Sequence, residues 1–262
     1  MNSSKKDIEL LSKWAKAYYG LSKLALDDKN LNADSFSGWV GELLGETKKE
    51  TPSGEKKEKP KKNYRDRFNG LEGEAREKAI LEAATKKGYR IVPKQKTGLN
   101  EQDVLRGLNQ IVIQKHPGIS PEEKKNLLVA LTSQIKAETG FAGCFNYNVG
   151  NYHAVGSKNT YWDGSVFIMD DPQRDLKTGE RYINKDWFWR SYSSLAQGLG
   201  DWYSFLFSKH KGAIDQAIAG NIQGYSQALG EKRYYTENIK TYTGIVSGVA
   251  TEIAKHYDKY NL

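Results

Sequence analysis

The segment from Ser120 to Gly140 contains both a start and a stop signal for one long helix. It constrains the fold more than any other part of the chain. Ser120 is a favourable N-cap, Pro121 suits the first helical position, and Glu123 completes a capping box with Ser120. Gly140 is a residue type at which helices end. The segment therefore predicts a helix with defined ends, whose apolar residues need partners elsewhere in the chain.

Helical periodicity recurs on both sides of this segment. Helices are expected over 7–26, 37–44, 71–86, 100–115, 193–207, 212–219, 224–229 and 241–257. The stretch 145–187 is rich in Asn, Gly, Tyr and Asp and contains short β signals. It predicts a hairpin that turns at Asp163-Gly164 and a second turn at Thr178-Gly179. This order of elements predicts a mainly α (α+β) fold, in which a small β lobe interrupts a helical domain.

A change in composition divides the chain into three parts. Residues 45–67 consist almost entirely of Lys, Glu, Pro, Gly and other polar residues, which is typical of a solvated linker. We expect an N-terminal helical segment over 1–44 and the main domain over 68–262, with its core over 120–258. An arm that binds a polyanion is the alternative for 45–67, but the interspersed glutamates favour a tether.

The 262 residues carry a net charge of +8, and their mean hydropathy is −0.72. Such a charge attracts polyanions without choosing among nucleic acid, anionic membranes and a bacterial wall. No run approaches the roughly 20 apolar residues of a spanning helix, so we expect no membrane span. The N-terminus has no apolar region of the kind found in signal peptides, so we expect no such leader.

Cys144 is the single cysteine, so an intrachain disulfide is excluded. We expect it to be a small buried residue rather than a catalytic thiol paired with His153. The chain has no zinc-ligand spacing, EF-hand loop or nucleotide-binding glycine motif. We therefore expect neither a metal nor a cofactor.

Glu138 occupies an anomalous position on the helix that follows Ser120. Leu127, Leu131 and Ile135 are spaced four residues apart on one face, and Glu138 follows on the same side. Burial raises the pKa of a carboxyl group, and the C-terminal end of a helix opposes a negative charge. Glu138 is therefore predicted to keep a proton near neutral pH, as a general acid must. A solvated glutamate on the helix rim is the alternative, which periodicity alone favours.

The residues around Glu138 resemble motifs of lysozyme-like peptidoglycan hydrolases, and most closely those of the bacterial glucosaminidase family. Glu138-Thr139-Gly140-Phe141 resembles the family's Glu-Ser/Thr-Gly-aromatic helix end, and residues 146–151 (NYNVGN) resemble its Asn-rich loop. Residues 189–195 (WRSYSSL) resemble its F-R-x-Y-x-S stretch. Residues 234–242 resemble its closing Y-x-T…Y motif, with a longer spacing between the tyrosines. The resemblance covers roughly residues 121–257.

The resemblance implies a helical scaffold with a β lobe across a cleft, and a glycan substrate. It implies Glu138 as the general acid and Tyr234 as an active-site tyrosine. Asn148 and Asn151 would hold the cleft loop or contact N-acetyl groups, and turn formation is the alternative for both. Sugar rings stack on aromatic side chains, so the candidates for substrate contact are Tyr147, Tyr152, Trp162 and Tyr235.

Many glycosidases use a second carboxylate as a base or nucleophile. The β lobe offers several Asp and Glu residues, and Glu180 and Asp171 are the candidates we select. A lytic transglycosylase requires no second carboxylate, because the acetamido group of its substrate assists instead. The sequence does not separate these reactions.

The expected function is therefore cleavage of peptidoglycan glycan strands, of N-acetylglucosaminidase or muramidase type, at the cell wall or in the periplasm. Three alternatives remain: a lytic transglycosylase, an inactive wall-binding or virion structural module, and a nucleic-acid-binding protein suggested by charge alone. The linker and the N-terminal helices favour delivery as part of a phage virion or another assembly, with docking through 7–44. Binding to a specific nucleic acid is not expected.

Overall fold

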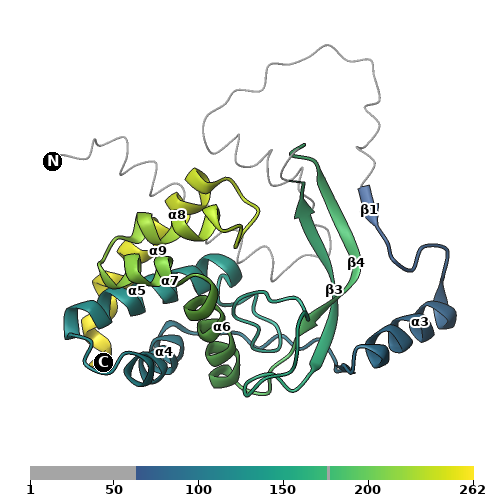
Figure 1. Ribbon diagram of the computed structural model, residues 1–262, viewed down its shortest axis with the longest axis horizontal. Coiled ribbons are helices and arrows are strands. Elements are labelled where there is room, and N and C mark those ends of the chain that lie inside the picture. The colour runs from purple at the N-terminus through teal and green to yellow at the C-terminus, as the bar shows by residue number, and fades with distance from the viewer. Residues whose placement is uncertain (1–62, 176–177) are drawn as a thin grey trace, which may run out of the picture. The chain divides into compact units, whose positions relative to one another are not determined.

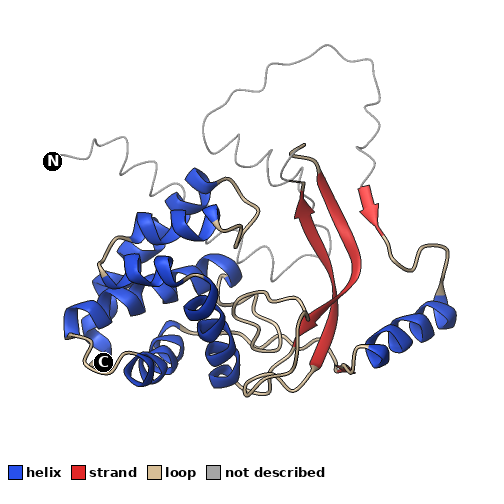
Figure 2. Ribbon diagram, in the orientation of Figure 1, coloured by secondary structure: helices blue, strands red, loops and turns tan. Residues whose placement is uncertain are grey.

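The computed structural model describes residues 63–175 and 178–262, which contain seven α-helices, one 3-10 helix and four β-strands (Figures 1 and 2). They belong to a unit that spans Lys62–Leu262. The helices expected over 7–26 and 37–44, and most of the 45–67 linker, lie outside the described residues. The predicted mainly α, α+β class is confirmed.

The helices lie close to their predicted positions. They are α3 (Gly73–Lys86), α4 (Glu101–Lys115), α5 (Pro121–Thr139), α6 (Leu195–Lys209), α7 (Lys211–Ile218), α8 (Ile222–Glu231) and α9 (Ile239–His256), which runs into the 3-10 helix η1 (Tyr257–Tyr260). Local capping explains this agreement, because Asn or Ser side chains at the N-caps of α4, α5, α6, α8 and α9 accept hydrogen bonds from the first turn.

Helix α5 is the centre of the helical part. The predicted capping box is present, with Ser120 N donating to Glu123 Oε2 at 2.9 Å and Glu123 N donating to Ser120 Oγ at 3.3 Å. Gly140 ends the helix at φ +56°. Every residue from Leu127 to Ile135 is buried, rather than a single stripe, because α4, α7 and α9 pack against different sides of α5.

The strands form one sheet in the order β1-β4-β3-β2. Strands β3 (Ser165–Arg174) and β4 (Arg181–Arg190) form an antiparallel hairpin. Strand β1 (Asn63–Arg65) pairs in parallel with β4, and β2 (Arg90–Ile91) pairs in parallel with β3. Residues 63–65, which composition assigned to the linker, therefore contribute to the sheet.

The hairpin turn predicted at Asp163-Gly164 is wrong, because that pair precedes the first strand of the hairpin. Asn159 Oδ1 instead accepts hydrogen bonds from the backbone N of Tyr161 and of Trp162, which folds residues 159–162 into a turn. The turn predicted at Thr178-Gly179 is confirmed, since Gly179 N donates to the carbonyl O of Asp175 at 2.8 Å between the two strands.

Two apolar clusters stabilise the unit. The larger one lies among α4–α9 and the loop that follows α5. The smaller one lies between α3 and the sheet and contains Phe68, Ile80, Trp162, Val166 and Phe188. Figure 1 shows β3 and β4 between α3 and the other helices. The hairpin is therefore supported by apolar contacts from α3.

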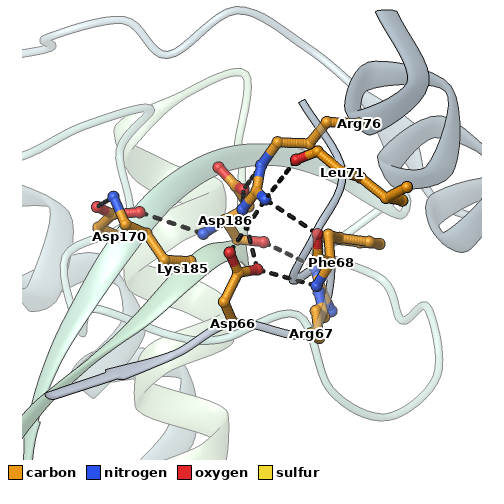
Figure 3. A network of polar contacts seen from close by, with 8 residues as sticks. All are labelled: Asp66, Arg67, Phe68, Leu71, Arg76, Asp170, Lys185 and Asp186. Atoms are coloured by element: carbon orange, nitrogen blue, oxygen red, sulfur yellow. Dashed lines mark hydrogen bonds and ion pairs between the residues drawn. The ribbon is translucent and has the colours of Figure 1, made fainter. Parts of the chain in front are cut away.

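Arg76 of α3 links this helix to the sheet through a polar network (Figure 3). Its Nη1 donates to Asp66 Oδ2 at 3.0 Å, and its Nε donates to Asp186 Oδ2 at 2.8 Å. Asp66 follows β1 and Asp186 lies in β4, so one guanidinium holds three elements together. Beside it, Lys185 Nζ donates to Asp170 Oδ2 at 2.9 Å, across β4 and β3.

A second polar network centres on Asp201, a residue of α6 that is only 4% exposed. Its Oδ2 accepts hydrogen bonds from Arg190 Nη1 and from Tyr192 Oη, both at 2.6 Å. Its Oδ1 accepts one from Asn159 Nδ2 at 2.7 Å. The guanidinium of Arg190 lies 4.3 Å from the centroid of the Trp162 ring. One carboxylate thus fastens α6 to the end of β4 and to the loop before β3.

We predict that Asp201→Asn lowers the free energy of unfolding by about 3–5 kcal/mol, because the buried Arg190 loses its counter-charge. Urea denaturation of the purified protein measures this change. Asp258→Asn serves as the control, since its ion pair with Lys125 is largely exposed and should contribute less than about 1 kcal/mol. Equal effects of the two substitutions would contradict the assigned role of Asp201.

Candidate active site

Glu138 lies in the last turn of α5, where the side chain is half-buried. The hydroxyl of Tyr242, from α9, donates a hydrogen bond to Glu138 Oε1 at 2.5 Å. Asn151, from the loop after α5, donates from Nδ2 to the carbonyl O of Glu138 at 3.2 Å. Three segments that are distant in sequence therefore meet at this glutamate.

Burial raises the pKa of Glu138 above the ordinary value of a glutamate, and hydrogen bonds from Tyr242 and Asn151 only partly oppose that effect. The direction agrees with the sequence prediction. A carboxyl group with a raised pKa keeps its proton at a pH where an exposed glutamate has lost it. Glu138 therefore has the protonation behaviour that a general acid requires, although its catalytic role remains a prediction.

Neutral tyrosines surround this carboxyl group. Tyr225 and Tyr242 are buried, and the rings of Tyr235 and Tyr242 stack with centroids 3.8 Å apart. Burial raises the pKa of the Tyr225, Tyr234 and Tyr242 hydroxyls, and the charge of Glu138 raises all three further. The phenols therefore stay protonated, and those of Tyr225 and Tyr242 donate hydrogen bonds to Gln134 Oε1 and Glu138 Oε1.

The closing motif contains Tyr234 and Tyr242, and the structure gives these two residues different contacts. Tyr234, the residue selected from the sequence, accepts a hydrogen bond from Trp202 Nε1 at 2.8 Å. Tyr242 makes the direct hydrogen bond to Glu138. Sequence reasoning missed Tyr242 as a site residue although the motif contains it, because only the packing of α9 on α5 brings its hydroxyl to the carboxyl group.

The Asn-rich loop, residues 146–151, packs closely against α6. Asn148 is 2% exposed, and its Nδ2 donates to the carbonyl O of Tyr152 at 2.9 Å and of Arg190 at 3.0 Å. A Cβ atom on Gly150 would lie 2.2 Å from Trp202 Cδ1, so only glycine fits there. Asn148 therefore secures the loop, whereas Asn151 lies at Glu138.

The predicted aromatic contacts have different surroundings. Trp162 is fully buried, and its Nε1 donates to the carbonyl O of Ser165 at 2.7 Å. It is thus a core residue, which corrects its assignment to substrate binding. Tyr152 is half-buried with its ring 5.1 Å from that of Phe205, and Tyr235 donates from its hydroxyl to the carbonyl O of Ser226 at 3.0 Å. Tyr147 is half-buried in the Asn-rich loop at φ +52°.

The two candidate second carboxylates also differ. Glu180 is exposed in the turn between β3 and β4, where its carbonyl O accepts a hydrogen bond from Asp175 N at 2.8 Å. Asp171 is 2% exposed within β3, accepts hydrogen bonds from Gln173 Nε2 and Asn184 Nδ2, and has its Oδ2 atom 3.2 Å from His153 Nε2. Burial raises the pKa of Asp171, but these three contacts outweigh it, so the pKa lies below the ordinary value.

Cys144 is buried, as predicted, and burial raises the pKa of its thiol to about 11. The backbone O of Cys144 accepts a hydrogen bond from Thr97 N at 3.0 Å, which anchors the neighbouring segment.

Over residues 63–175 and 178–262, no three His, Cys, Asp or Glu side chains gather as metal ligands. No helix in these same ranges is long and apolar enough to cross a membrane.

Two cavities lie away from Glu138. One, of about 330 Å³, is lined by Ile113, His116 and the turn between α4 and α5. The other, of about 290 Å³, lies between residues 90–97 and the N-terminal end of α6. Glu138 lines neither of them.

No protein-family model matches the chain, and no curated protein matches it. The structure is similar to a peptidoglycan hydrolase mutant from Sphingomonas sp. A1, with a TM-score of 0.39 and 20% sequence identity, over 56% of this chain and 99% of that chain. A C-terminally truncated glycoside hydrolase domain of FlgJ from Salmonella typhimurium gives 0.38 and 20%, over 60% of this chain and 99% of that chain. The FlgJ glycoside hydrolase domain gives 0.38 and 18%, over 62% and 94%.

The raised pKa of Glu138 makes stability depend on pH. The folded-state pKa exceeds the unfolded one, so the wild type loses stability as the pH rises through the folded pKa. Glu138→Gln removes this loss. We predict that the unfolding free energy of the variant, relative to the wild type, increases as the pH rises from the ordinary glutamate pKa of about 4.3 towards neutral pH.

Urea denaturation across this pH range measures the difference. Glu77→Gln is the matched control, because it makes the same substitution at an exposed position on α3. A relative stability of Glu138→Gln that falls with rising pH would show that the folded-state pKa of Glu138 is lowered, contrary to this account.

Proposed function

We propose that this chain is a glycoside hydrolase that cleaves the glycan strands of bacterial peptidoglycan, with Glu138 as the general acid. The observation that carries the proposal is the state of the Glu138 carboxyl group. It lies at the end of the buried central helix, its pKa is raised, and a neutral tyrosine hydroxyl donates to one of its oxygens.

These contacts suit the departure of a sugar. The oxygen of a glycosidic bond is a poor leaving group unless an acid protonates it as the bond to the anomeric carbon breaks. Tyr242 Oη donates to Glu138 Oε1, which leaves Oε2 as the oxygen that carries the acid's proton. After the transfer, the same hydrogen bond stabilises the carboxylate that remains.

The choice of substrate rests on the motifs around the acid. The helix end at Glu138–Phe141 and the loop over 146–151 resemble those of lysozyme-like peptidoglycan hydrolases. The bond from Asn151 Nδ2 to the backbone O of Glu138, which joins the loop to this helix end, supports the comparison. We propose a lysozyme-like fold and an N-acetylglucosaminidase or muramidase type of cleavage, acting at the cell wall.

A wall-binding module without catalysis is the second candidate. The observation that favours it is the enclosure of Asp171, since a carboxylate that accepts two amide hydrogen bonds and is 2% exposed is a poor nucleophile or base. Delivery by a phage virion or another assembly, with docking through residues 7–44, is a further proposal about a segment outside the described residues.

Digestion of purified peptidoglycan by the wild type and by Glu138→Gln tests the function. Glutamine keeps the shape of the side chain and removes the transferable proton. We expect the wild type to release glycan fragments and the variant to lose at least about 10²-fold in rate, as when a general acid is removed. Mass spectrometry of the fragments gives both the yield and the chemical ends.

The control is Glu122→Gln, because Glu122 is exposed in the first turn of the same helix. Reducing ends identify a hydrolase, whereas anhydro-sugar ends identify a lytic transglycosylase that uses the same acid. Peptidoglycan binding by the wild type without any fragment release would replace the catalytic proposal with the binding module.

A further inference from the structure

Helix α6 carries two exposed phenylalanines that have different neighbours. Phe205 and Phe207 are both 37% exposed. An α-helix turns by about 100° per residue, so side chains two residues apart lie on different sides of it. Phe207 packs against the end of α4, where its ring centroid lies 5.6 Å from that of His116. Phe205 belongs instead to a group of aromatic side chains on another side of α6.

Three rings surround Phe205. Its ring centroid lies 5.1 Å from that of Tyr152 and 5.3 Å from that of His210. Tyr234 completes this aromatic group at 6.4 Å. The planes of the three rings are tilted by 50° to 68° from that of Phe205, so none of them is stacked on its face. Phe205 therefore has ring surface open to a ligand, while its neighbours hold the ring in place.

Two members of the aromatic group lie next to the proposed acid. Asn151 donates from Nδ2 to the carbonyl O of Glu138, and Tyr152 is the next residue in the chain. The charge of Glu138 also raises the pKa of the Tyr234 hydroxyl, an effect that operates only between neighbouring groups. The aromatic group therefore extends from the surroundings of Glu138 to the exposed ring of Phe205.

Hydrogen bonds to one buried residue of α6 fix both tyrosines. Tyr234 Oη accepts from Trp202 Nε1 at 2.8 Å, and Tyr152 Oη donates to the carbonyl O of Trp202 at 3.4 Å. Trp202 itself is 1% exposed. The aromatic group is thus ordered before any ligand arrives, so a ligand that covers it immobilises few side chains.

An aromatic surface with polar groups at its edge suits a sugar. The C–H groups on the face of a sugar ring pack against an aromatic ring, whereas the hydroxyl and acetamido groups at its rim need polar partners. The exposed amide of Asn151, beside Tyr152, is such a partner. A single exposed phenylalanine needs no ligand to explain it. Phe205 differs because it continues a surface that begins at the acid.

We propose that Phe205 is the platform of a sugar subsite, on which one sugar of the peptidoglycan glycan strand stacks while Glu138 acts on a bond further along the strand. The inference rests on the proposed function, since it takes the glycan strand as the ligand. Tyr152 and Tyr234 connect the platform to the acid, and buried His210 supports the ring from within the fold. Phe205 contributes binding and takes no part in proton transfer.

Binding of soluble glycan strands, freed of their stem peptides, tests the subsite in the full chain. Glu138→Gln is the parent protein, because it should leave the strands intact during the measurement. Phe205→Leu in this parent keeps an apolar side chain and removes the aromatic face. We expect it to weaken binding by about 3- to 10-fold, as the loss of one aromatic contact does. Phe205→Trp should bind at least as well as the parent, because it keeps an aromatic face.

Phe207→Leu is the matched control, since it makes the same substitution at the same exposure on the same helix. It should leave binding unchanged. Equal weakening by the two leucine substitutions would overturn the subsite, and so would unchanged binding in Phe205→Leu. Phe205→Trp that binds as weakly as Phe205→Leu would overturn it as well.

Kinetics with Glu138 in place separate this inference from the proposed function. Phe205→Leu should raise KM for the strands by a similar factor and leave kcat nearly unchanged, because a platform binds substrate and transition state alike. Fragment release by the wild type with an unchanged KM in Phe205→Leu would overturn the subsite and leave the acid standing. Weakened binding in Phe205→Leu beside a wild type that releases no fragments would leave the subsite standing and overturn the acid. A parent that binds no strands would overturn the subsite.

Discussion

The burial of α5 on all sides is the constraint on which the rest of the structure depends. Four of its side chains, Leu127, Leu128, Leu131 and Ile135, are fully buried, and each contributes roughly 1.5–3 kcal/mol relative to an exposed position. A shift of one pKa unit costs only about 1.4 kcal/mol. Apolar burial therefore decides where the helix lies, and the carboxyl group at its end adopts a raised pKa as the consequence.

The polar networks show how the surrounding segments are held around this helix. Asp201 ties α6 to the end of β4, and Asn148 ties the loop after α5 to the same strand. Arg76 holds α3 to the middle of β4 through Asp186. Asp201 and Asn148 are nearly fully buried and have several hydrogen-bond partners each, whereas Arg76 is partly exposed. The loop that carries Asn151 is therefore held beside the end of α5 by buried polar contacts.

Local signals account for what could be predicted from the sequence. The ends of α5 follow from Ser120, Glu123 and Gly140, which interact within a few residues of one another. The raised pKa of Glu138 agrees with the position of this residue on the face of Leu131 and Ile135, although periodicity alone favoured a solvated glutamate. The hairpin turn at Asp163-Gly164 failed because a favourable turn dipeptide does not determine which strands pair, and the side chain of Asn159 redirects the chain first.

Long-range contacts explain the rest. Tyr242 reaches Glu138 across 104 positions, and His153 meets Asp171 from a different element, so neither contact has a signature in the local sequence. Aromatic composition could not separate Trp162, which is a core residue, from half-buried rings such as Tyr152. Residue types alone therefore suggested the chemistry, whereas the packing of α9 and of the hairpin determined the partners.

The most direct test of the central claim is the titration of Glu138 itself. Carbon-13 NMR of the protein labelled at the glutamate carboxyl carbons follows each group with pH, and the spectrum of Glu138→Gln assigns the resonance of Glu138. The account predicts a midpoint above the ordinary glutamate pKa of about 4.3. A midpoint at or below that value would show that the carboxyl group is ionised at neutral pH, and it would contradict Glu138 as the proton donor.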